Sequence, residues 1–152
     1  MPVESVVRTE VLKLPLNPCP INPSWILEGT PVARNVLLSY SADGNASTLI
    51  WDCTAGRFNW FYDVDETIYV LEGGMVIRDG SGTRRLSAGD SIFFPKGARA
   101  EWTVDAYIRK IAFCRTPMPW PLVFAKRGFR SLKRRLRLGG GKDSPPAMFQ
   151  GG

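Results

Sequence analysis

The chain of 152 residues contains no histidine. Histidine is the commonest metal ligand in proteins and a frequent general base for cysteine or serine nucleophiles. Its absence argues against a histidine-bound metal centre and against a catalytic triad. The three cysteines, Cys19, Cys53 and Cys114, form no Cys-x-x-Cys pair. We therefore predict reduced, packed thiols rather than disulfides, with nucleophilic catalysis by Cys53 or Cys114 as the minor alternative.

The sequence also lacks any long apolar run. No stretch approaches the roughly 20 apolar residues that a membrane-spanning helix needs. The first residues, MPVESVVRTEVLKLP, have no basic start followed by an apolar core, which is the pattern of a secretory signal. We therefore expect a cytoplasmic protein whose length suits one domain with a core of its own.

Acidic residues are scarce in the C-terminal part. Residues 126–152 hold eight Lys or Arg and the single acidic residue Asp143, whereas residues 1–125 hold 12 Lys or Arg and 13 Asp or Glu. The overall net charge of +6 therefore comes from the tail.

The stretch from Phe58 to Trp102 carries short alternating runs of branched and aromatic residues, broken by glycine and aspartate. Runs with this period of two predict strands, and Asp79-Gly80 predicts a hairpin turn. We also predict strands over residues 34–41 and 47–53, and two strands joined through Asp105-Ala106. Together these elements predict a small all-β antiparallel barrel.

Two motifs have a characteristic spacing, Glu66-x6-Gly73 and Gly89-Asp90-x4-Pro95-x-Gly97. They resemble the two motifs of the cupin superfamily, and the details are similar to the branch typified by (S)-ureidoglycine aminohydrolase and the ethanolamine-utilisation cupins (DUF861-type). The resemblance spans about residues 25–115 and includes Trp51, Cys53, Thr54, Gly56, Phe58, Trp60, Tyr62, Asp65, Leu71, Glu72, Phe94, Lys96, Trp102, Arg109 and Lys110. It implies a jelly-roll barrel and a homodimer.

Metal-binding cupins place two histidines and a glutamate in the first motif and a histidine in the second. Here the first two positions fall on Trp60 and Tyr62, or on Asn59 and Phe61, and the last falls on Ala100. Only Glu66 remains, and one carboxylate is too few ligands for a divalent transition metal. We therefore predict no metal and no other cofactor.

The resemblance implies that the barrel interior is the site. We expect Trp60, Tyr62, Glu66 and Trp102 around its mouth, with Lys96 or Lys110 as further ligand-binding residues. Aromatic walls with one acid suit a small polar or cationic ligand. Within an apolar cavity the pKa of Glu66 would rise, which suits a general acid or base. The alternative is that Glu66 pairs with an Arg or Lys inside the barrel and only holds the fold together.

For several other residues in and near these motifs we predict structural roles in strands, turns and the core. Asp65 and Glu66 should face opposite sides of their strand, so they would not form a carboxylate pair. Gly89-Asp90 and Pro95-Lys96-Gly97 predict turns. Trp51 and Trp102 are large enough to be core residues. Of Arg109 and Lys110, one should face the interior, and we expect Lys110 to face solvent.

Leu122, Ala125, Phe129, Leu132 and Leu136 recur at intervals of three and four, the pattern of an amphipathic helix with an otherwise basic face. Residues 122–138 would then contact an anionic membrane surface or nucleic acid phosphates. The plainer alternative is an apolar face packed on the barrel or on a second copy, with solvated charges.

The predicted organisation is a Pro-rich arm at residues 1–24 with a short edge strand at 6–14, a cupin barrel at 25–118, a basic helix at 119–138 and a flexible Gly-rich tail at 139–152. Three functions remain open. The first is metal-free binding of a small nitrogen-containing or carboxylate metabolite. The second is a hydrolase or isomerase similar to ureidoglycine aminohydrolase, with Glu66 as acid/base. The third is a dimeric scaffold whose basic tail contacts a membrane or nucleic acid.

Overall fold

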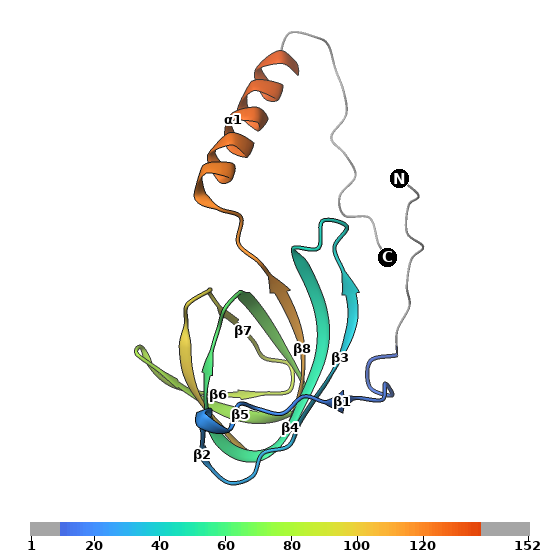
Figure 1. Cartoon of the computed structure of the whole chain (residues 1–152), viewed down its shortest axis with the longest axis vertical. Coiled ribbons are helices and arrows are strands. Elements are labelled where there is room, and N and C mark those ends of the chain that lie inside the picture. Colours follow the sequence, from blue (N-terminus) through green and yellow to red (C-terminus); the bar gives the residue numbers. More distant parts are fainter. Residues whose placement is uncertain (1–9, 138–152) are drawn as a thin grey trace. The chain divides into compact units, whose positions relative to one another are not determined.

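The main body of the protein is one antiparallel sheet of eight strands that curls into a barrel (Figure 1). The computed structural model describes residues 10–137, and beyond Pro119 it describes the side chains of residues 121–128 and 130 only. The predicted all-β jelly roll with a C-terminal helix is confirmed. The elements are β1 (Asn17–Pro18), the 3-10 helix η1 (Pro23–Trp25), β2 (Ile26–Glu28), β3 (Ala33–Tyr40), β4 (Ala46–Phe61), β5 (Asp65–Asp79), β6 (Gly82–Ser87), β7 (Ser91–Phe94), β8 (Arg99–Arg115) and α1 (Trp120–Arg137).

Three long strands, β4, β8 and β5, lie side by side and form the main part of the sheet (Figure 1). The sheet continues through β3 to β1 on one side and to β6 on the other, while β2 pairs with β4 and β7 pairs with β5. Alternation along the strands divides interior from exterior: in β5, Ile68 and Val70 are fully buried whereas Tyr69 is exposed. The interior is therefore bounded by the alternate side chains of β4, β5 and β8.

The predicted turns at the cupin-like motifs are present. Gly89 has a φ of 96°, and the Asp90 carboxylate accepts a hydrogen bond from the Ser87 amide at 2.8 Å. Gly97 has a φ of 88° in the turn that precedes β8. Asp79 ends β5 and Gly82 begins β6, as the Asp-Gly signal predicted.

The prediction of two strands joined through Asp105-Ala106 is wrong, because β8 is one strand of 17 residues. Its pairing with β4 moves from Thr54 opposite Tyr107 to Gly56 opposite Val104. Two steps along β4 thus match three steps along β8, which is a β-bulge. The Asp-Ala pair absorbs one extra residue there and bends the strand without ending it.

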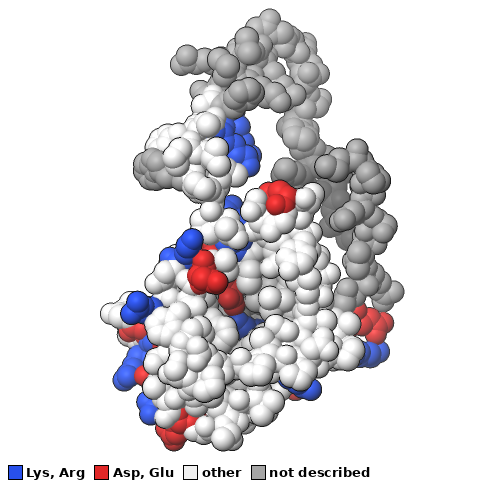
Figure 2. All heavy atoms as spheres, viewed as in Figure 1, with Lys and Arg blue, Asp and Glu red and all other residues white. Residues whose placement is uncertain are grey.

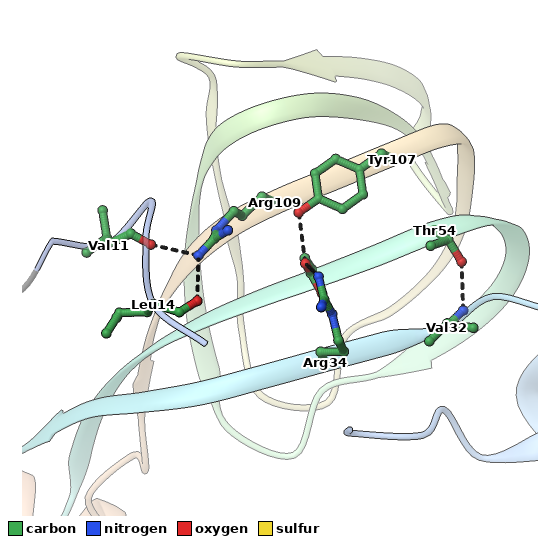
Figure 3. A network of polar contacts seen from close by, with 8 residues as sticks. Val11, Leu14, Val32, Arg34, Thr54, Tyr107 and Arg109 are labelled. Atoms are coloured by element: carbon green, nitrogen blue, oxygen red, sulfur yellow. Dashed lines mark hydrogen bonds and ion pairs between the residues drawn. The ribbon is translucent and has the colours of Figure 1, made fainter. Parts of the chain in front are cut away.

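The N-terminal arm lies against the outer face of the barrel through Arg109 (Figure 3). The Arg109 guanidinium donates to the carbonyl oxygens of Val11 at 2.7 Å and Leu14 at 3.5 Å. The predicted edge strand at residues 6–14 is wrong for its described part, because residues 11–13 form a turn closed by the Lys13 amide and the Glu10 carbonyl. Pairing with β3 begins only at Asn17.

Asp52 lies beside this contact on the same outer face and is 1% exposed. Its carboxylate accepts hydrogen bonds from the Arg34 guanidinium and, at 2.8 Å, from the Tyr107 hydroxyl (Figure 3). A buried carboxylate needs such partners, because an unpaired buried charge is costly. The arm and this network bury the outer face of β4 and β8 at the level of Arg109.

The helix α1 belongs to a second compact unit, Met118–Gly152, whereas the barrel unit ends at Pro117. Pro121 occupies the second helical position, where its missing amide hydrogen costs nothing. Within residues 10–137, no helix is long and apolar enough to cross a bilayer. The predicted flexible tail, 139–152, lies outside the described residues.

Candidate functional site

The interior of the barrel holds one buried ion pair. The Lys110 ammonium donates to Glu66 Oε1 at 2.6 Å, and the two residues are 4% and 8% exposed. Glu66 comes from the start of β5 and Lys110 from the second half of β8, in adjacent strands. The structure thus shows the pairing of Glu66 with a cation inside the barrel. The role of Glu66 as a general acid or base stays a prediction.

The expectation that Lys110 faces solvent is wrong. Arg109 and Lys110 do alternate across β8, but both are buried because the N-terminal arm covers Arg109 on the outer face. Lys110 points inward, where its ammonium lies 5.0 Å from the ring centroids of both Trp51 and Trp102. The two indole faces stabilise the cation, so the lysine is held by one carboxylate and two rings.

The side chains around this pair offer more hydrogen-bond donors than the described residues use. Lys110 has three N–H donors, and Glu66 is the one acceptor that contacts it in the described part of the chain. The indole N–H of Trp51 is buried and has no acceptor there. Buried polar groups without a partner are uncommon and costly, so this N–H indicates a place for an acceptor that residues 10–137 do not supply.

Tyr62 adds a further donor. Its hydroxyl oxygen accepts from the Trp102 indole N–H at 3.1 Å, which leaves its own proton without an acceptor among residues 10–137. Burial raises the pKa of Tyr62 far above its usual range, and the negative charge of Glu66 raises this pKa further. The hydroxyl therefore stays protonated and keeps its proton for donation.

The sequence-predicted site residues separate into two groups. Tyr62, Glu66, Trp102 and Lys110 come together in the interior through the contacts above. Trp60 also packs inward, edge-on to Trp51 at 5.9 Å, and belongs to the aromatic cluster with Phe58 and Trp102. Lys96 is exposed in the turn before β8, where its backbone amide donates to Asp65. The structure does not bring Lys96 together with the interior residues, and its contact with a ligand stays a prediction.

Trp51 is the site residue that sequence reasoning missed. We interpreted it as core, and it is 5% exposed, but its ring contacts Lys110 and its N–H lacks an acceptor within the described residues. Its pairing with Lys110 across β4 and β8 places the two on the same face. No short-range pattern signals that pairing, because it depends on the register of two strands about 60 residues apart.

The metal that the cupin resemblance implies does not fit these residues. The Glu66 carboxylate is engaged by an ammonium, and the positions expected for histidines carry Trp60, Tyr62 and Ala100. Within residues 10–137, no three His, Cys, Asp or Glu residues gather as a ligand set. A divalent cation next to Lys110 would also meet a like charge, so no step is assigned to a metal.

The cysteines are free thiols. Burial raises the pKa of Cys53 to about 12 and that of Cys114 to about 11. A nucleophilic cysteine needs a lowered pKa to supply thiolate, so neither thiol is suited to nucleophilic catalysis.

A pocket of about 620 Å³ is lined mainly by residues of β6, β7 and the turn that follows β7, with Asp79 at the end of β5 and Arg99 at the start of β8. Phe94 lines this pocket and also stacks on Tyr62, with ring centroids 4.2 Å apart. Lys110 and Glu66 do not line it. The stack of Phe94 on Tyr62 is the contact that links this pocket to a residue of the polar cluster.

Comparison with known proteins supports the fold and its branch. Residues 40–112 match the EutQ-like cupin domain. A solved putative ethanolamine utilization protein Q from Salmonella typhimurium is 26% identical, with a TM-score of 0.50 over 55% of this chain and 69% of that one. A DUF861-family protein of unknown function from Pseudomonas syringae is 25% identical, with a TM-score of 0.62 over 67% of this chain and 45% of that one.

The EutQ protein of Clostridium difficile has the same fold, at 21% identity and a TM-score of 0.56, over 74% of this chain and 88% of that one. No curated protein has a significantly similar sequence.

Proposed function

The chain belongs to the EutQ-like branch of the cupin superfamily, and from that premise we propose that its barrel binds a small polar metabolite without a metal. The ligand is held through carboxylate or carbonyl oxygens. The Lys110 ammonium supplies the positive charge, and the Trp51 N–H and Tyr62 hydroxyl donate further hydrogen bonds. The observation that carries this proposal is the buried Trp51 N–H without an acceptor in the described chain.

The donor surplus favours an oxygen-bearing ligand over a cationic one. An amine would compete with Lys110 for the same two ring faces and for the Glu66 carboxylate, and it would leave the Trp51 N–H unpaired. A carboxylate takes up the unused donors and pairs with a cation already in place. Among nitrogen-containing metabolites, those that also carry a carboxylate, such as amino acids, therefore fit best.

The test is a thermal-shift screen of small carboxylates, amides and amines, including ethanolamine, followed by calorimetry on the hits. Carboxylates should raise the melting temperature and simple amines should not. Trp51→Phe, which keeps a ring and removes the N–H, should weaken binding about 5- to 10-fold, in the range of one buried hydrogen bond. Lys96→Met, at the exposed turn, is the matched lysine control and should bind as the wild type does.

Two outcomes would contradict this function. One is a screen in which only amines stabilise the protein. The other is a carboxylate whose affinity is the same in Trp51→Phe and wild type. The enzymatic alternative, with Glu66 as acid/base, predicts turnover of a bound ligand that Glu66→Gln abolishes. The homodimer and the cytoplasmic location remain predictions from the resemblance and the sequence.

A further inference from the structure

The helix α1 combines an apolar face with an exclusively basic polar face. Residues 120–137 contain seven Lys or Arg and no Asp or Glu. At 100° per residue, Leu122, Ala125, Phe129, Leu132 and Leu136 fall on one side. Lys126, Arg130, Lys133 and Arg137 flank this side, Arg127 and Arg134 lie opposite it, and Arg135 lies on its other flank. Trp120, Val123 and Phe124 of the first turn lie away from the apolar side, so the helix is amphipathic from about residue 125 onward, with one sign of charge.

The described side chains of α1 are mostly exposed, those of the apolar Leu122 and Phe124 included. Leu122 is 55% exposed, and the basic side chains gather on one side of the helix (Figure 2). On the barrel face in view, acidic and basic side chains are intermingled instead (Figure 2). The charge is divided in the same way along the sequence, because residues 1–125 have one more acidic than basic residue. The excess of positive charge that could attract the chain to an anionic surface therefore lies in residues 126–152.

We propose that α1 binds the surface of an anionic lipid membrane, lying in the plane of the interface. Nucleic acid phosphates would engage the basic face and leave the apolar face in water. An anionic bilayer engages both, since lipid headgroups pair with Lys and Arg while the apolar side chains enter the acyl boundary.

The experiment uses the full chain with sedimented vesicles of phosphatidylcholine alone and of phosphatidylcholine and phosphatidylserine in a three-to-one ratio. The protein should bind the anionic vesicles and leave the neutral ones largely unbound. Binding should fall steeply between about 0.1 and 1 M salt, as the Debye length shrinks from about 10 to about 3 Å. A fluorescent DNA duplex and a single-stranded RNA are titrated in parallel.

Two double variants separate the faces of the helix. Lys133→Gln with Arg134→Gln removes two charges and should weaken vesicle binding roughly 10- to 30-fold, from about 1 kcal/mol per basic residue near the surface. Leu132→Gln with Leu136→Gln keeps every charge and should weaken it at least 10-fold. The control, Arg84→Gln with Arg85→Gln, removes two exposed charges from β6 and should bind as the wild type does.

Three results would overturn the proposal. The first is no binding to anionic vesicles, as expected if the apolar face of α1 packs on protein. The second is vesicle binding that the paired leucine variant leaves unchanged. The third is binding to DNA or RNA that is tighter than vesicle binding and insensitive to the leucine variant, which assigns the basic face to nucleic acid.

Discussion

Replacing Glu66 by leucine is expected to lower the free energy of unfolding by about 3–5 kcal/mol, because it leaves the Lys110 ammonium buried without its carboxylate. The two indole rings 5.0 Å away recover part of that loss, since a desolvated cation–π contact contributes about 2 kcal/mol. The measurement is urea denaturation followed by tryptophan fluorescence.

The matched double variant, Glu66→Leu with Lys110→Met, should return to within about 1 kcal/mol of wild type, because replacing a whole buried ion pair by apolar residues is often neutral. The control is the exposed ion pair of Asp105 and Arg85, whose charged atoms lie 2.9 Å apart and whose side chains are both more than half exposed. Removing the Asp105 carboxylate should lower the free energy of unfolding by less than about 1 kcal/mol. A Glu66→Leu variant as stable as wild type would show that the pair is not formed in solution.

Substituting Gly73 by alanine is the second change with a large expected effect. A Cβ at Gly73 would lie 2.0 Å from the carbonyl oxygen of Tyr107 in β8, a backbone atom that cannot move aside alone. Gly73 also has a φ of 71°, which costs an L-residue about 1–2 kcal/mol. The clash and the strain together should lower the free energy of unfolding by at least about 3 kcal/mol.

Two further glycines separate these causes. Gly44 has a φ of 69° but open space around a Cβ, so Gly44→Ala should cost only the strain, about 1 kcal/mol. Gly80 has open space and no such φ, so Gly80→Ala should change stability by less than about 0.5 kcal/mol. Equal effects of all three substitutions in chemical denaturation would contradict the role assigned to Gly73.

The first cupin-like motif thus needs glycine at position 73 because a Cβ would clash with β8 and because the backbone has a positive φ. Glycines at such positions are one reason why the fold could be predicted from the sequence. Gly73, Gly89 and Gly97 each adopt a positive φ, and the strands between them alternate as their sequence does. Asp105-Ala106 fits a turn as well as a bulge, because the two share the same residue types. Whether the strand bulges or turns depends on its pairing with the neighbouring strand β4, and sequence spacing alone does not show that pairing.

The interior site could be predicted only in part. Tyr62, Glu66 and Trp102 followed from the motif and from strand alternation. Lys110 was placed in solvent because buried lysines are rare, and its burial depends on three long-range contacts, with Glu66, Trp51 and Trp102. The unused donor of Trp51 has no sequence signal, since it is defined by what the surrounding residues fail to supply.

In the proposed function, the Lys110 ammonium provides the positive charge of a barrel that binds its ligand without a metal. The most direct measurement is the transition-metal content of the purified, untagged full chain by elemental analysis. We predict far less than one equivalent of any transition metal, unchanged when the protein is incubated with divalent cations and then dialysed. A stoichiometric metal that Lys96→Met retains and Glu66→Gln loses would contradict the account.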